Sequence, residues 1–228
     1  HKNLIPDINL TPYSIWLATV VVSGISYLSY LLKRYVFHES GTLVSGIIGG
    51  LYSSTATISV LARKSRKASE QEATDYVAAM LLAVSMMFLR FMILILIFSR
   101  EIFLSIYPYL LTMAVVAAIV AWFIHSRQKR PEDQPAETEE DDSSNPLEFK
   151  VALIFAVLFV IFTFLTHYTL VYAGTGGLNL LSFVSGFSDI TPFILNLLQN
   201  TGSVAALIIT ACSMQAIISN IMVNMFYA

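Results

Sequence analysis

The sequence predicts an all-α integral membrane protein, and three observations carry this prediction. The 228 residues are 56% hydrophobic and only 12% charged, about half the charged share of a typical soluble domain. The mean hydropathy is +0.71. The apolar residues form long continuous runs, and a helix needs about 20 such residues to cross a bilayer. Because barrel strands would be short and would alternate apolar with polar residues, we predict helices rather than a barrel.

The same composition excludes other classes. A single cysteine, Cys212, excludes a disulfide scaffold, and the long aliphatic runs exclude a disordered chain. A net charge of −2 argues against a nucleic-acid partner. The chain begins with His rather than Met, so we expect it to be part of a longer protein.

Seven apolar runs are long enough to cross the membrane as helices. Gly, Ser and Thr interrupt the second and the sixth, and the sixth also holds Pro192. We therefore expect helices two and six to be broken. The predicted spans are Pro12–Leu32, Leu43–Leu61, Tyr76–Phe98, Ile102–Ile124, Val151–Tyr172, Leu178–Leu198 and Val204–Phe226.

The distribution of Lys and Arg predicts the orientation. With seven spans, nine basic residues fall on the side of the N-terminus and three, Lys33, Arg34 and Arg100, fall on the other. The positive-inside rule then places the N-terminus in the cytoplasm and the C-terminus outside.

The acidic, proline-containing segment between spans four and five has no apolar periodicity. We expect it to be a disordered cytoplasmic linker. It divides the chain into residues 1–126, which hold the first four spans, the linker at 127–148, and residues 149–228, which hold the last three.

The two parts resemble each other. Aligning Gly50 with Gly186 pairs Ser53 with Asp189, and Ala83–Met86 matches Ala211–Met214 in the following spans. We therefore predict two three-helix repeats, joined by the fourth helix and the linker. If every run crosses the membrane, the repeats are parallel; if span two or six turns back halfway, they are inverted. The charge asymmetry favours the parallel case.

Arg90 and Asp189 are the charged residues that fall inside predicted spans. A charge at mid-membrane costs several kcal/mol, about 3 on the translocon scale, and such residues usually face the protein interior or a wet cavity. We expect the two to be partners. They either form a structural salt bridge or line a binding or permeation site.

The breaks predict free backbone N–H groups at two half-helix starts inside the membrane. Thr191 followed by Pro192 resembles an N-cap and a first helical position, with Ser188 or Asp189 as alternative caps. Gly49–Gly50 would allow a break in span two, capped by Ser53 or Ser54. The candidate ion- or substrate-binding residues are Asp189, Ser188, Thr191, Ser53, Ser54, Thr55, Thr57, Arg90 and Asn220.

These residues carry a family resemblance. The run Gly49–Thr57, the following Leu61–Ser65, Arg90, Ser185–Asp189 and Ser219–Asn220 are similar to the uncharacterised membrane domain found behind MgtC/SapB-type domains, domain of unknown function 4010. The resemblance covers essentially the whole chain and implies a polytopic inner-membrane protein without an established activity. The family implies a Lys about where Asn224 stands, so a basic group is missing there.

The function we expect is a transporter or channel for a small ion or solute, with its site at the polar breaks of spans two and six. Asp189 would bind a proton or a hard cation such as Mg²⁺, helped by hydroxyl oxygens, and Arg90 would balance the empty site. The reverse assignment is an anion bound by Arg90 and the half-helix N-termini. The alternatives are a non-transporting scaffold or regulatory subunit and, least favoured for want of a nucleophile motif, an intramembrane hydrolase. We expect no catalytic residues or cofactor; the expected partners are lipid, the ion or solute, a second copy, and an MgtC/SapB-type domain.

Overall fold

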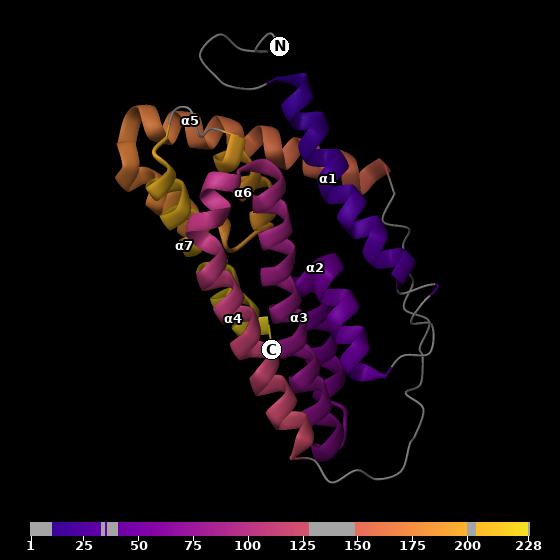
Figure 1. Cartoon of the computed structure of the whole chain (residues 1–228). Coiled ribbons are helices and arrows are strands. Elements are labelled where there is room, and N and C mark those ends of the chain that lie inside the picture. Colours follow the sequence, from indigo (N-terminus) through magenta and orange to yellow (C-terminus); the bar gives the residue numbers. More distant parts are fainter. Residues whose placement is uncertain (1–10, 33–34, 36–40, 128–148, 200–203, 228) are drawn as a thin grey trace. The chain divides into compact units, whose positions relative to one another are not determined.

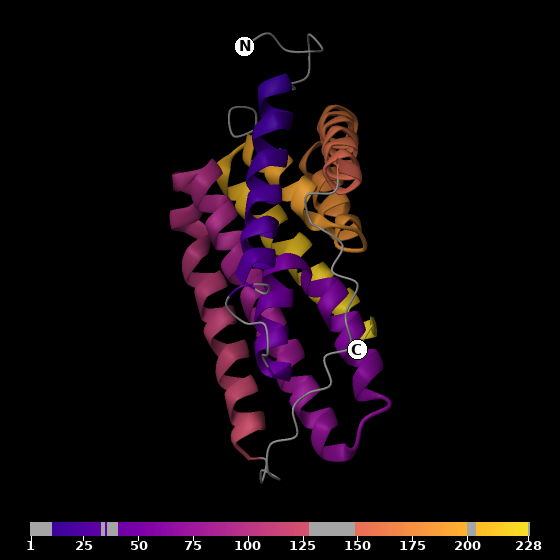
Figure 2. The same cartoon turned by 90° about the vertical axis from the view of Figure 1, so that its right-hand side faces the viewer.

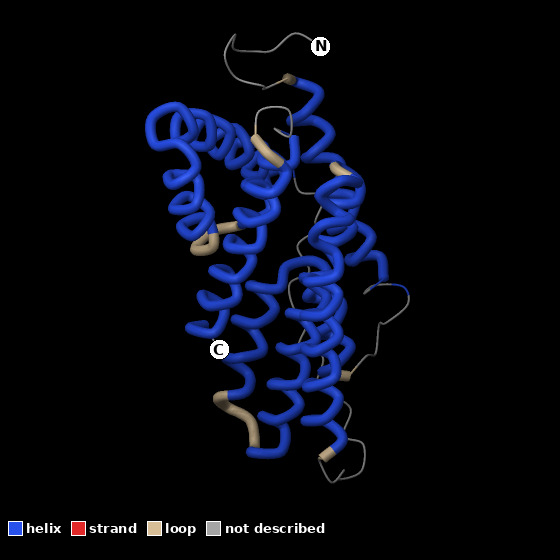
Figure 3. Tube along the Cα trace, turned by 60° about the vertical axis from the view of Figure 1, so that its left-hand side comes forward, coloured by secondary structure: helices blue, strands red, loops and turns tan. Residues whose placement is uncertain are grey.

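The computed structural model describes residues 11–32, 35, 41–127, 149–199 and 204–227, and these contain helices and no strand (Figure 3). The predicted all-α class is therefore confirmed. The linker at 128–148 lies outside the described residues. Figure 1 labels the helices, which are α1 (Pro12–Leu31), α2 (Thr42–Ser65), α3 (Glu70–Phe98), α4 (Arg100–Ser126), α5 (Phe149–Ser185), α6 (Ile190–Gln199) and α7 (Ala206–Tyr227).

Six of the helices in the described ranges are long and apolar enough to cross a membrane. The exception is α6, which has ten residues and would extend only about 15 Å at 1.5 Å per residue. The multi-pass membrane class thus agrees with the sequence. The number of helices is also seven, but one of them is too short to span a bilayer by itself.

The boundary between the predicted fifth and sixth spans is a kink inside α5. The sequence predicts a loop between Tyr172 and Leu178; in the structure two helical segments meet there at one non-helical residue, Gly174, and the second segment continues to Ser185 (Figure 1). Gly174 has φ 60° and ψ −151°, a positive φ that glycine adopts without steric cost. The apolar run 178–198 is consequently divided between the end of α5 and the short helix α6.

The chain forms two compact units, and each is described by itself. Helices α1, α3, α4 and α7 contribute residues to both. Unit 1 contains α5, α6 and most of α7, and unit 2 contains α2, most of α3 and most of α4. Their ranges are His1–Ser23, Met92–Tyr107 and Leu147–Val223 for unit 1, and Gly24–Phe91, Pro108–Pro146 and Asn224–Ala228 for unit 2.

In unit 2, small residues bring α2 against α3, and the two helices lie side by side in Figures 1 and 2. A Cβ added at Gly46 would meet the backbone of Ala79, and one added at Gly50 would lie 2.6 Å from the Cα of Ala83. Small residues four apart allow close helix packing in membranes. The Gly46–Gly50 motif therefore serves packing within the chain.

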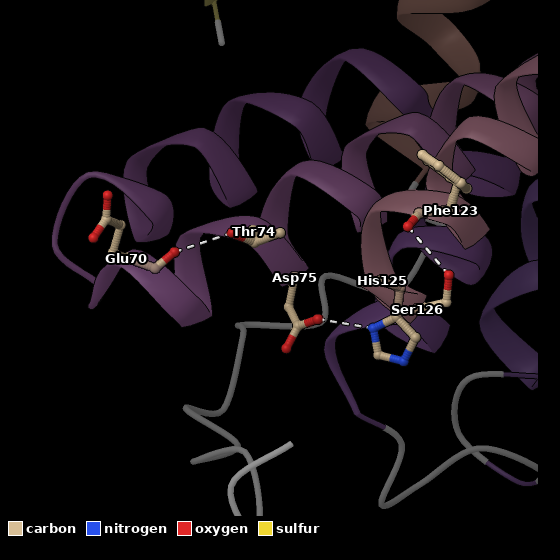
Figure 4. Close-up of polar contacts among 6 residues, drawn as sticks. All are labelled: Glu70, Thr74, Asp75, Phe123, His125 and Ser126. Carbon is tan, nitrogen blue, oxygen red and sulfur yellow. Dashed lines mark hydrogen bonds and ion pairs between the residues drawn. The ribbon is translucent and has the colours of Figure 1, made fainter. Parts of the chain in front are cut away.

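Polar contacts join α3 to α4 in the same unit. The Ser85 hydroxyl donates to the Ala114 carbonyl at 2.8 Å, and His125 Nδ1 lies 2.9 Å from Asp75 Oδ1 (Figure 4). Asp75 is near the start of α3 and His125 near the end of α4, so the two helices run antiparallel.

The start of α3 is fixed by a capping box. The Ser69 backbone N–H and hydroxyl both donate to Glu72 Oε2 at 2.9 Å, and the Glu72 N–H donates back to Ser69 Oγ at 3.4 Å. This reciprocal pairing satisfies backbone donors that the first helical turn leaves without a partner.

In unit 1, α6 is enclosed by protein. All nine residues from Ile190 to Leu198 are buried. Phe193 packs on Phe162 of α5 with ring centroids 5.6 Å apart, and the Asn196 amide donates to Thr163 Oγ1 at 2.7 Å. Helix α6 is therefore part of the core of unit 1.

Candidate functional site

The first candidate segment, in unit 1, is the break between α5 and α6. Helix α5 ends at Ser185, residues 186–189 form a turn, and α6 starts at Ile190. Asp189 Oδ1 accepts the backbone N–H of Thr191 at 2.9 Å. Asp189 is therefore the N-cap, one of the alternatives left open by the sequence. The expectation that Thr191 is the N-cap and Pro192 the first helical residue is wrong, because α6 begins at Ile190. Thr191 is therefore the second residue of the helix and Pro192 the third.

The side chains of this break differ in exposure. Ser188 and Asp189 are exposed, whereas Thr191 is buried. The Ser188 hydroxyl donates to the Ser185 carbonyl at 3.3 Å, and its oxygen keeps lone pairs for a further partner. An exposed carboxylate next to a hydroxyl oxygen is a ligand pair suited to a hard cation.

Helix α7 contacts both the turn and the last helical turn of α5. The Ser219 hydroxyl donates to the Phe183 carbonyl at 2.7 Å, and Asn220 Nδ2 donates to the Gly186 carbonyl at 3.1 Å. A Cβ added at Gly186 would meet the Ser219 side chain and would lie 2.8 Å from the Asn220 backbone nitrogen. The predicted ligand Asn220 is thus buried and bonded to the turn that carries Asp189.

The second candidate segment, described by itself in unit 2, is the break in α2. It occurs at Ser53, whose φ of −157° and ψ of 102° are extended rather than helical. The Ser53 hydroxyl oxygen accepts the Ala56 N–H at 3.4 Å, so Ser53 caps the half-helix that follows. The expectation of a break at Gly49–Gly50 is wrong, because both glycines are helical.

The hydroxyl residues at and after this break differ in how deeply they are buried. Ser54 is buried, and Ser53, Thr55 and Thr57 are half-buried. A Cβ added at Gly49 would meet the Thr57 side chain, so the backbone before the break approaches the side chain after it. Glycine is needed here for close approach and not as a hinge.

Arg90 contacts the break in α2. Its Nη1 donates to the carbonyl of Tyr52, the last residue before Ser53, at 2.7 Å. A guanidinium at the C-terminal end of a half-helix is favoured by the helix dipole. Arg90 belongs to unit 2 and Asp189 to unit 1, so the expected pairing of the two stays a prediction.

The model of one protein family matches residues 20–228 of the chain, and that family is described as Domain of unknown function (DUF4010). The chain belongs to the DUF4010 family. The match includes both breaks and every residue of the candidate site, as the resemblance in the sequence suggested. No curated protein and no solved structure matches the chain. Membership in DUF4010 therefore assigns the chain to a family without assigning an activity.

In this DUF4010 chain, groups of three or more His, Cys, Asp or Glu that could hold a metal ion are absent from the residues with a described position. A cation at Asp189 would accordingly depend on hydroxyl, backbone and water oxygens for its other ligands.

Sequence reasoning omitted three polar features of the DUF4010 core from the candidate site. Ser219 carries the family resemblance but is not among the predicted binding residues. The buried pair Asn196 and Thr163 gave no signal, because each lies in an apolar run and they are 33 residues apart. The hydroxyls of Thr166 and Ser213 are buried without a hydrogen-bond partner among the described residues.

Proposed function

We propose that the protein is a transporter or channel for a small ion, with a proton or a hard cation bound at Asp189. The observation that carries the proposal is that the backbone leaves the helical conformation at Ser53 inside α2 and at 186–189 between α5 and α6, in segments apolar enough to lie in a membrane. Non-helical backbone at membrane depth is tolerated where it is enclosed by protein or lines a wet cavity, and discontinuous helices form the ion sites of many transporters.

The turn at 186–189 supplies the chemistry for a cation. Asp189 uses one carboxylate oxygen, Oδ1, to cap α6, which leaves Oδ2 for an ion. Ser188 offers a neighbouring hydroxyl oxygen, and both side chains are exposed. Because Asn caps a helix about as well as Asp, the cap does not need the charge of Asp189, which supports transport over the alternative of a non-transporting subunit. The chemistry requires no covalent step, so we propose no enzymatic activity.

The proposed topology follows the charge pattern. The loop between α2 and α3, which holds Arg66 and Lys67, lies on the cytoplasmic side with the N-terminus, and the α3–α4 junction at Arg100 lies outside. The proposed membrane is the inner membrane of the cell, as the family resemblance implies. An MgtC/SapB-type domain in the same chain or complex, or a second copy of this chain, is the proposed protein partner.

Asp189→Asn tests the function, because Asn caps a helix about as well as Asp but carries no charge. The full chain is reconstituted in liposomes, and flux of protons, Mg²⁺ and a panel of monovalent ions is measured beside the thermal midpoint in detergent. Asp189→Asn should keep the thermal midpoint and lose the flux. Asp189→Ala should lose the flux and also about 1 kcal/mol of stability with the cap.

Glu101→Gln is the matched control, since Glu101 is a carboxylate in the first turn of α4 and is not at a break. It should leave the flux unchanged. Flux that survives in Asp189→Asn would remove Asp189 from the site. A parent protein that carries none of these ions faster than protein-free vesicles would favour the scaffold or regulatory subunit.

A further inference from the structure

The two breaks lie at equivalent positions of the two halves, because matched residues differ in number by one constant value. The half-helix after the first break starts at Ser54 and the one after the second at Ile190, a difference of 136. The next long helices start at Glu70 and Ala206, again 136 apart. The caps Ser53 and Asp189 keep the same offset, as the Gly50–Gly186 alignment predicted.

The packing contacts keep this offset as well. Gly50 lies against Ala83 of α3, and Gly186 lies against Ser219 of α7. Ala83 and Ser219 also differ by 136. The contacts therefore pair Ala83 with Ser219 and not with Ala211, so they do not support the match between Ala83–Met86 and Ala211–Met214.

In each half, the third helix donates to backbone carbonyls just before the break or at its first residue. Arg90 of α3 donates to Tyr52, and on α7 Ser219 donates to Phe183 and Asn220 to Gly186. The last carbonyls of a helix lack the usual partner within the helix, and leaving a carbonyl unpaired in an apolar environment is costly. The Phe183 carbonyl also accepts the Gly186 N–H at 3.2 Å, so the Ser219 hydroxyl is its second donor. The second break is the longer, covering residues 186–189, and Asn220 donates directly to it.

We infer that, in each half of the chain, side chains of the third helix hold the interrupted helical segment in place by hydrogen bonds to its backbone, an interaction we call the fastening. Arg90 does this in the first half, and Ser219 and Asn220 do it in the second. They act as positioning residues for the caps Ser53 and Asp189. Arg90 and Asn220 then act on the backbone and are not ligands of the ion. The consequence for ion binding at Asp189 rests on the proposed function, but the fastening itself does not.

The second half is tested with a spin label at Phe187→Cys, in a Cys212→Ser background that leaves no other thiol. Phe187 is 63% exposed and lies in the turn. Ser219→Ala and Asn220→Leu should each increase the mobility of the label, with loss of the immobilised component of its spectrum. Ser213→Ala is the matched control, because Ser213 lies on the same helix and its buried hydroxyl has no partner among the described residues. It should leave the spectrum unchanged.

The first half is tested with the label at Ala56→Cys, an exposed position in the first turn after Ser53. Arg90→Met should increase its mobility, and Arg90→Lys, which keeps a charged donor, should restore part of the immobilised component. Ser85→Ala is the control, since Ser85 is on α3 but bonds to α4.

Unchanged spectra in Ser219→Ala and Asn220→Leu, or in Arg90→Met, would overturn the fastening in that half. An equal increase in the control variants would also overturn it, because the effect would then be general loosening of the helix. Neither readout uses flux. If the protein carries no ion but the spin labels show the expected changes in mobility, the proposed function is wrong and this inference still holds.

Discussion

Glycine is required at positions 50 and 186 by the atoms that face them and not by backbone conformation. A methyl group at Gly50 would meet the backbone of Ala83, which cannot move aside as a flexible side chain can. Gly186 faces the Ser219 side chain and the backbone nitrogen of Asn220. Both residues have ordinary negative φ, since Gly174 is the one described glycine with positive φ.

Gly50→Ala and Gly186→Ala should therefore each lower stability by about 1–3 kcal/mol, the usual cost of overpacking a close contact. The control is Gly24→Ala, because Gly24 is inside α1 and an added Cβ would meet nothing within 4 Å. This variant should be neutral or gain up to about 1 kcal/mol in helix propensity. Thermal midpoints in detergent measure all three, and a loss in Gly24→Ala equal to the other two would refute the contact argument.

At the scale of the element, similar sequence segments have different roles. Ser85 of α3 and Ser213 of α7 lie in matching Ala-x-Ser-Met motifs, and both are buried. Ser85 donates to the Ala114 carbonyl of α4, whereas the Ser213 hydroxyl has no partner among the described residues. The motif alone does not show which serine joins two helices.

Ser85→Ala should lower stability by about 1 kcal/mol, the net value of one hydrogen bond. Ser213→Ala should hold or raise it, because removing a buried hydroxyl without a partner removes a desolvation cost. Chemical or thermal unfolding in detergent compares the two. Equal losses would show that Ser213 has a partner in the folded protein.

At the scale of the whole molecule, the charge pattern makes a prediction about sidedness. Lys67 and Arg100 are both exposed at helix ends, in the α2–α3 loop and at the start of α4. They should lie on opposite sides of the membrane, because α3 is long enough to cross it. The rule that basic loops stay in the cytoplasm places Lys67 inside.

Single cysteines at Lys67 and Arg100 in a Cys212→Ser background test this prediction. In intact cells, an impermeant thiol reagent should label Arg100→Cys and leave Lys67→Cys protected until the membrane is opened. The reverse pattern would invert the topology, and labelling of both positions would mean that α3 does not cross.

The sequence by itself determined the class of the protein. Long apolar runs with few charges predict membrane helices whatever the tertiary arrangement, because the bilayer acts on each segment separately. The polar interruptions at 49–57 and 185–192 also located both breaks, since Gly, Ser, Thr and Pro weaken a helix locally. The family resemblance pointed the same way.

Only the tertiary structure decided which residue forms each break and what holds it. Ser53 is extended while Gly49 and Gly50 stay helical, because the glycines are used for contacts with Thr57 and Ala83. The partner of Arg90 at Tyr52 is 38 residues away, and those of Ser219 and Asn220 are more than 30 away. Such contacts leave no local pattern, because a carbonyl acceptor belongs to every residue and carries no signature in the side chains.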